Sequence, residues 1–168
     1  MRLIIVPILL VILAACIPAI QKHKMVNIFD PNEVSWFDKY GGNSIKGSAL
    51  IRQVGGGVVT CAGNEVNLIP SSTYADERMF AIYGSNSAGY SEYGALLIED
   101  VPDTQYLVKS KETYCDAQGF FKFSNLPDGS YYVVTSIVWH VGSDRQGGVL
   151  MQAVHLYGGQ EVEVVLSP

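Results

Sequence analysis

The sequence predicts a mainly β protein, an antiparallel two-sheet β-sandwich with one or two short helices. From Ile45 onward, short runs of β-branched and aromatic residues alternate with glycine-containing turns. The C-terminal half contains no long helical period, so its strands must bury their apolar faces against one another. We therefore expect a single sandwich domain over residues 30–168.

A short helix is expected at the start of this domain. Asp30 can cap its N-terminus, with Glu33 three residues later as in a capping box. Pro31 suits the first helical position, and Gly41 can end the helix in a left-handed conformation. The aromatic residues between these signals are expected to pack on the core. Strands are then predicted at residues 45–54, 58–60 and 65–69.

A second helix is predicted at residues 74–83, with Thr73 as its cap and Gly84 at its end. The segment that follows, residues 85–93, is polar and contains glycine and tyrosine. These features are typical of an exposed loop.

The C-terminal half has the clearest strand pattern. Turn residues at 116–119 and 126–129 flank an aromatic strand, and residues 130–141 form the longest strand candidate. Strict alternation places Tyr131, Val133 and Ile137 on one face of that strand. The last two strands, residues 149–157 and 161–166, are predicted to pair with each other about Gly158 and Gly159.

The N-terminus predicts export and lipidation. Residues 3–12 are apolar and follow Arg2, a run too short for a spanning helix, which needs roughly 20 apolar residues. Residues 13–16, Leu-Ala-Ala-Cys, resemble the lipobox of bacterial lipoproteins, in which the cysteine is acylated and becomes the first mature residue. We expect residues 1–15 to be a signal peptide, Cys16 to carry the lipid, and residues 16–29 to form a tether. The alternative is an ordinary signal peptide with a chance cysteine.

This assignment predicts a protein of the cell envelope, held in the outer membrane if the organism is Gram-negative, since Ile17 rather than aspartate follows Cys16. Cleavage of the signal peptide would remove Arg2, so the formal net charge would change from −5 for the full sequence to −6 for the mature protein. This acidic balance argues against a nucleic-acid partner. In an oxidising compartment Cys61 and Cys115 are expected to form a disulfide. Two free buried thiols are the alternative.

The chain also resembles the carboxypeptidase regulatory-like family, which has a transthyretin-like fold. The resemblance covers roughly residues 45–141, and its 11 matching positions are Gly63, Val66, Leu68, Asp116, Gly119, Phe121, Phe123, Leu126, Pro127, Gly129 and Tyr131. It implies a structural or binding module rather than an enzyme. Residues 71–110 stand where the family has a short connection, and they form an insertion whose role the resemblance does not supply.

The sequence favours a non-catalytic function without a cofactor. It contains neither a His-x-x-Glu nor a Gly-x-Ser-x-Gly motif. The leading hypothesis is an envelope lipoprotein with a structural or protein-binding role, and another envelope protein is the expected partner. The candidate binding surface consists of Tyr83, Asn86, Tyr90 and Tyr93, because tyrosine offers contact area at low entropic cost. Tyrosines that pack back onto the sandwich are the alternative.

Two other functions stay open at this stage. If the strands that contain His140 and His155 pair, the two imidazoles would approach one another and form a metal site of a small enzyme. Carbohydrate binding by exposed aromatic residues is the second, although the sequence does not single out a sugar-binding platform.

Overall fold

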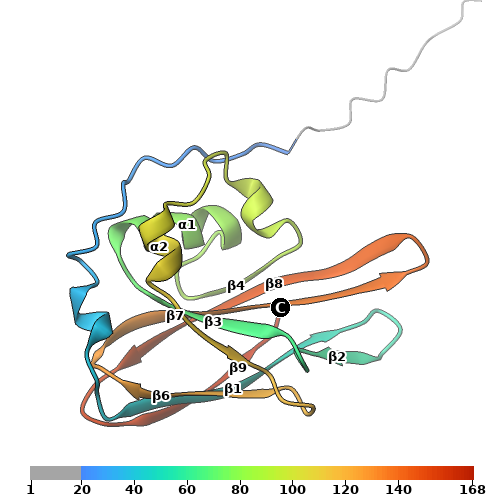
Figure 1. Cartoon of the computed structure of the whole chain (residues 1–168). Coiled ribbons are helices and arrows are strands. Elements are labelled where there is room, and N and C mark those ends of the chain that lie inside the picture. Colours follow the sequence, from blue (N-terminus) through green and yellow to red (C-terminus); the bar gives the residue numbers. More distant parts are fainter. Residues whose placement is uncertain (1–19) are drawn as a thin grey trace, which may run out of the picture.

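The computed structural model describes residues 20–168, so the predicted signal peptide and the predicted lipidation site, Cys16, lie outside the described residues. Two β-sheets pack face to face, and a layer of short helices covers the outer face of one of them (Figure 1). This arrangement confirms the predicted mainly β two-sheet sandwich. Within the described part of the chain, no helix is long and apolar enough to cross a membrane.

The two sheets contain all the strands predicted from the sequence. The four-stranded first sheet contains β1 (Asn43–Arg52), β2 (Val58–Thr60), β6 (Phe120–Leu126) and β9 (Glu161–Leu166). The five-stranded second sheet has the order β4 (Ala88–Ser91), β8 (Asp144–Leu156), β7 (Gly129–Val141), β3 (Glu65–Pro70) and β5 (Lys111–Tyr114). The alternation predicted for β7 is confirmed, since Tyr131, Val133 and Ile137 are buried between the sheets.

The predicted pairing of the last two strands is wrong. β8 pairs with β7 and β4, whereas β9 crosses to the first sheet and runs parallel to β1. The connection turns at Gly158 and Gly159, which both have positive φ angles. The buried Asn43 side chain then holds the chain, because its Oδ1 accepts hydrogen bonds from Gly159 N and Gln160 N, each at 2.9 Å.

The N-terminal helix is shorter than predicted. Residues around Asp30 form turns, and only Ser35–Asp38 is helical, as the 3-10 helix η1. Glu33 does not complete a capping box on Asp30. Its carboxylate instead accepts hydrogen bonds from Thr73 N at 2.7 Å and from Thr73 Oγ at 3.0 Å, at the start of the next helix. That tertiary contact replaces the local one that the sequence indicated.

Residues 71–110 form a helical layer on the outer face of the second sheet (Figure 1). The predicted second helix is confirmed as α1 (Thr73–Tyr83), although Ser72 rather than Thr73 caps it. η2 (Gly94–Leu97) and α2 (Thr104–Val108) complete the layer. The segment predicted to be an exposed loop contains β4, which pairs with β8. This layer has a hydrophobic cluster of its own against the sheet, with Phe29, Val34, Tyr74, Ala75, Met79, Tyr106, Tyr132 and Met151 buried in it.

Cys61 and Cys115 form the predicted disulfide. Cys61 directly follows β2 of the first sheet, and Cys115 directly follows β5 of the second. Their Cα atoms are 5.8 Å apart, and both residues are buried. The bond therefore links the two sheets covalently near the end of the sandwich where these strands stop.

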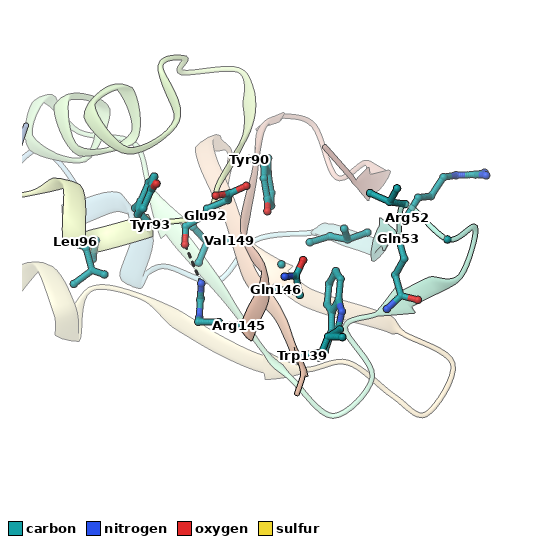
Figure 2. A pocket seen from close by; sticks show the side chains of 17 residues that line it. Arg52, Gln53, Tyr90, Glu92, Tyr93, Leu96, Trp139, Arg145, Gln146 and Val149 are labelled. Atoms are coloured by element: carbon teal, nitrogen blue, oxygen red, sulfur yellow. Dashed lines mark hydrogen bonds between the residues drawn. The ribbon is translucent and has the colours of Figure 1, made fainter. Parts of the chain in front are cut away.

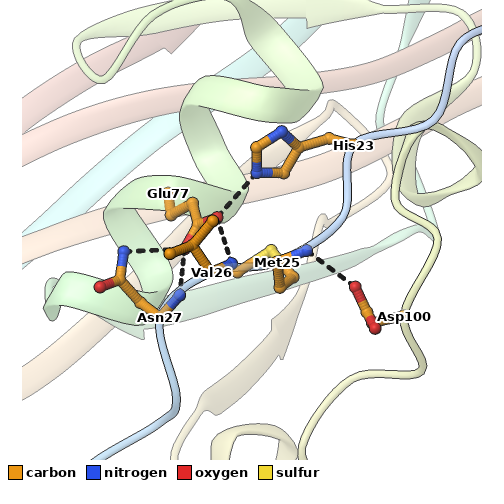
Figure 3. A network of polar contacts seen from close by, with 6 residues as sticks. All are labelled: His23, Met25, Val26, Asn27, Glu77 and Asp100. Carbon is orange, nitrogen blue, oxygen red and sulfur yellow. Dashed lines mark hydrogen bonds and ion pairs between the residues drawn. The ribbon is translucent and has the colours of Figure 1, made fainter.

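Residues 23–29, the later part of the predicted tether, are bound to the domain. The Glu77 carboxylate on α1 accepts hydrogen bonds at 2.7 Å from His23 Nε2, Val26 N and Asn27 N, and a fourth at 2.8 Å from Asn27 Nδ2 (Figure 3). Phe29 is buried beneath this segment. Glu77 therefore gathers donors that are distant from it in sequence, and the role of residues 16–29 as a tether stays a prediction.

Candidate functional site

An open cleft of about 1030 Å³ lies at one end of the sandwich. Three chain segments form it: the turn between β1 and β2, the tip of the β7–β8 hairpin, and the chain from β4 into η2. We call it the aromatic cleft after Tyr90, Tyr93 and Trp139, which line it. Figure 2 shows Arg52 and Gln53 at one end, Tyr93 and Leu96 at the other, and Tyr90, Gln146 and Trp139 between them. The cleft is therefore elongated.

Two consecutive glycines in β8 bring the aromatic rings close to the backbone. A Cβ atom on Gly147 would lie 2.8 Å from the Trp139 ring and 2.1 Å from the Ile137 carbonyl oxygen. A Cβ atom on Gly148 would lie 2.9 Å from the Tyr90 ring. Gly147 also has a φ of +82°, which favours glycine. Any other residue at these positions would displace the rings that line the cleft.

Trp139 comes from the same face of β7 as the buried core residues. At this end of the sandwich it is only partly buried, and it packs on the edge of the core. Tyr90 on β4 is also partly buried, whereas Tyr93 is 48% exposed. Trp139 and Tyr90 lie within strands, and Tyr93 follows two residues after β4. The positions of the three rings therefore do not depend on a long loop.

Polar groups surround these rings. Arg145 lies in β8, and its Nη1 donates a 3.0 Å hydrogen bond to the Glu92 carbonyl oxygen, which joins the hairpin tip to the chain after β4 (Figure 2). Burial and the Glu92 carboxylate raise the pKa of Tyr90, while Arg145 acts in the opposite direction. The Tyr90 hydroxyl therefore stays protonated at neutral pH and can donate a hydrogen bond.

The structure divides the candidate binding surface predicted from the sequence. Tyr90 and Tyr93 lie in the aromatic cleft. Tyr83, the last residue of α1, instead lines a separate cavity, where burial raises its pKa. Asn86 is exposed and lines neither cavity. Two of the four predicted residues thus lie together in one cleft, and the binding role of this surface stays a prediction.

The predicted approach of His140 and His155 is wrong. β7 and β8 do pair, but His140 lies opposite Arg145 and His155 opposite Ser130. The two histidines are therefore ten residues apart along the hairpin, or roughly 33 Å at 3.3 Å per residue. Among residues 20–168, no group of three or more histidine, cysteine, aspartate or glutamate side chains is arranged to hold a metal ion.

Sequence reasoning missed Trp139, Gln53 and Arg145 as site residues. Alternation placed Trp139 on the core face, and it gave no indication that the sandwich opens where this residue lies. The pair Gly147 and Gly148 was the one available signal, because consecutive glycines inside a strand indicate a close approach by another group. The partners of that approach come from other elements and are set by the tertiary structure.

The chain shares its fold with a candidate carbohydrate-binding protein from Pseudomonas aeruginosa, whose crystal structure superposes with a TM-score of 0.69. Sequence identity is 22%, and the match covers 86% of this chain and 100% of that chain. At this identity the likeness establishes the fold alone. Neither a protein-family model nor a curated protein sequence matches the chain.

Proposed function

We propose that this protein is a lipid-anchored, non-catalytic protein of the cell envelope that binds glycans in the aromatic cleft. The observation that supports this function best is the cleft itself. It is open and elongated, it is lined by Tyr90, Tyr93 and Trp139, and polar side chains are interleaved with these rings. An extended oligosaccharide has matching chemistry along its length.

The match has a simple physical basis. Each sugar ring presents C–H groups on its faces, which pack on aromatic rings, and hydroxyls at its edge, which need hydrogen-bond partners. Aromatic rings supply a large apolar surface, and the Gln53 and Gln146 amides can both donate and accept hydrogen bonds. The fold neighbour described as a candidate carbohydrate-binding protein supports the same ligand class.

The charges of the cleft favour an acidic glycan. Arg52 and Arg145 line it together with a single carboxylate, that of Glu92. An arginine can hold a carboxylate through two parallel hydrogen bonds. We therefore expect oligouronates to bind more tightly than neutral oligosaccharides of equal length, and this preference to weaken as salt is raised.

Binding to oligogalacturonate, cello-oligosaccharides and chito-oligosaccharides, measured by isothermal titration calorimetry, tests the proposal. With the probe that binds the wild-type protein most tightly, Trp139→Ala is expected to weaken affinity about tenfold or more, which corresponds to roughly 1.4 kcal/mol. Tyr93→Ala is expected to act in the same direction. Because Tyr93 is half exposed, this second variant separates lost contact from disturbed folding.

Tyr40→Ala is the matched control, because Tyr40 is a highly exposed aromatic residue outside the cleft. It should leave binding unchanged. Equal affinity in the wild-type protein and both cleft variants would contradict the proposal. So would specific crosslinks from the cleft to an envelope protein that disappear in Trp139→Ala, if every probe failed to bind the wild-type protein.

Lipid attachment at Cys16 is the proposed route to the membrane. In a bacterial host supplied with radiolabelled palmitate, the full-length protein is expected to incorporate the label, and Cys16→Ser should abolish incorporation. More than one acyl chain is needed for stable anchoring, so the variant should also leave the membrane fraction. Labelling that persists in the variant would refute this assignment. Cys61→Ser is the control cysteine, and it should keep the label.

A further inference from the structure

A second cavity, of about 460 Å³, lies beneath the helical layer of residues 71–110. It separates α1, α2 and the chain around η2 from the outer face of β3, β7 and β8. Its walls are mainly apolar, with Ile69, Met79, Ile82, Leu107, Val134 and Val149 among the lining residues. The volume is in the range of small-molecule sites, roughly 300–1,000 Å³. We call it the inner pocket.

Arg78 of α1 is an unusual component of this wall. Its guanidinium carbon lies beside the paired rings of Tyr74 and Tyr106, 5.7 Å and 5.5 Å from their centroids. The residue is only 5% exposed, and its Nη1 has no hydrogen-bond partner among residues 20–168. None of the ion pairs found in this part of the chain includes Arg78.

This arrangement is energetically incomplete. Arginine remains protonated in proteins, so Arg78 cannot become neutral to avoid the cost of burial. The two tyrosine rings supply cation–π attraction of about 0.5–2 kcal/mol each, whereas a buried ion without a counter-charge costs several kcal/mol. An anion in the inner pocket would balance this charge.

Two phenols add donors to the same wall. Burial raises the pKa of Tyr106 to about 12, although the neighbouring Arg78 acts against this increase, and burial raises the pKa of Tyr83 as well. Both hydroxyls are therefore protonated at neutral pH. The inner pocket thus combines a guanidinium and two hydroxyl donors with an apolar surface.

The geometry points to a monocarboxylate with an apolar body as the ligand: we propose that its carboxylate pairs with Arg78 and that its hydrocarbon part packs on Ile69, Met79 and Val134. Glu65 and Glu112 also line the pocket, but both are exposed, so water screens their repulsion of an anion more than it screens the attraction of the buried Arg78. Their repulsion is smaller for a single negative charge than for a dianion such as a phosphate monoester. A monocarboxylate joined to an apolar group therefore fits the buried cation and the apolar walls best.

Octanoate is the probe, and octan-1-ol and octylamine are matched in length but differ in head group. Calorimetric titration of the wild-type protein should show saturable binding of octanoate that is at least about tenfold tighter than that of octan-1-ol. Octylamine should bind more weakly still, because its charge repels Arg78. Equal affinity for octanoate and octan-1-ol, or no binding of octanoate, would overturn the proposal.

Arg78→Met keeps an unbranched side chain that can pack in the same place and removes the charge. It should reduce octanoate affinity about tenfold or more, while the unliganded variant stays at least as stable as the wild type, because the uncompensated charge is gone. Arg78→Lys keeps the charge but lacks the planar guanidinium group, and this variant should retain part of the affinity for octanoate. Unchanged octanoate binding in Arg78→Met, or a large loss of stability without ligand, would assign Arg78 a purely structural role.

This ligand is independent of the glycan proposed for the aromatic cleft. The two cavities share Gly94, Ala95 and Val149 as a common wall, but Arg78 lines only the inner pocket and Trp139 only the aromatic cleft. Octanoate binding therefore tests the inner pocket whether or not any glycan binds. Tyr40→Ala, outside both cavities, should leave octanoate binding unchanged.

Discussion

Replacing Cys61 and Cys115 by alanine is expected to lower the free energy of unfolding by roughly 4 kcal/mol, which is the loop-entropy value for a closed loop of this length. The bond joins residues 54 apart in sequence and on different sheets, so it restricts the unfolded chain strongly. Urea denaturation followed by tryptophan fluorescence measures the difference. The midpoint should shift to lower urea, and the slope should increase because the unfolded chain becomes more extended.

Measurement of the reduced wild-type protein separates two contributions to the free energy of unfolding: that of the disulfide bond and that of the packing of the sulfur atoms. It should be destabilised by nearly the same amount as the double alanine variant. The variant should be slightly less stable, because both cysteines are buried and alanine leaves small cavities. A reduced wild-type protein within 1 kcal/mol of the oxidised one would show that the link between the sheets contributes little.

Glu77→Gln is expected to release the N-terminal segment from the domain and to lower the free energy of unfolding by about 2 kcal/mol. A charged acceptor strengthens each hydrogen bond, and contributions of about 1.5–3 kcal/mol are typical of bonds to charged groups. The Glu77 side chain is only 12% exposed, so water does not easily replace its partners. Hydrogen exchange should show faster exchange of the Val26 and Asn27 amides, with β7 unchanged.

The same carboxylate predicts a dependence on pH. Burial alone would raise the pKa of Glu77, but hydrogen bonds from His23, Asn27 and Val26 outweigh it and lower the pKa from 4.5 to about 2. Because the folded-state pKa is lowered, its contribution to stability is complete above about pH 4.5. It is lost as the pH falls from there through 2. Docking of residues 23–27 should weaken over that interval.

Glu161→Gln is the matched control for this experiment. Hydrogen bonds from Lys122, Lys46 and Ser44 lower the pKa of Glu161 to about 2 as well, but this residue is exposed on β9 and does not contact the N-terminal segment. Both variants should lose part of the acid sensitivity of the wild type. Only Glu77→Gln should expose the Val26 and Asn27 amides at neutral pH, and protection retained in it would contradict the assigned role of Glu77.

The docked segment has a consequence for the proposed anchor. If the lipid is attached at Cys16, only six residues separate Cys16 from His23, where contact with the domain begins. The domain would then lie close to the membrane surface while Glu77 is ionised. Release of residues 23–29 would lengthen this connection, so in a protein anchored at Cys16 the hydrogen bonds at Glu77 would determine how far the aromatic cleft extends from the membrane.

Local features of the fold were predictable from the sequence. The inward face of β7 follows from period-2 alternation, and α1 follows from its cap and its terminal glycine. The disulfide was expected because Cys61 and Cys115 are the two of three cysteines that remain once Cys16 is assigned to the lipid, and the predicted export implies an oxidising compartment. Each of these signals involves neighbouring residues or a count of residues, so no knowledge of distant contacts was needed.

The site residues were less predictable for the same reason. Tyrosine-rich composition singled out Tyr90 and Tyr93, which do lie together in the cleft, but it grouped them with Tyr83, which lines the cavity on the opposite side of the η2 wall. Alternation assigned Trp139 to the core without indicating where the core ends. The burial of Arg78 had no local signal, because the charged pattern of α1 is equally typical of an exposed helix face.

The sequence by itself determined the sandwich class, most of its strands and the disulfide, since alternation, turn chemistry and cysteine number act over short distances or through composition. The tertiary structure decided the rest. The register of β7 on β8 placed His140 and His155 at opposite ends of a hairpin, and Asn43 directed β9 into the other sheet. The packing of residues 71–110 on the sheet enclosed Arg78 without an ion-pair partner among residues 20–168. These outcomes depend on contacts between residues far apart in the chain, which no local pattern specifies.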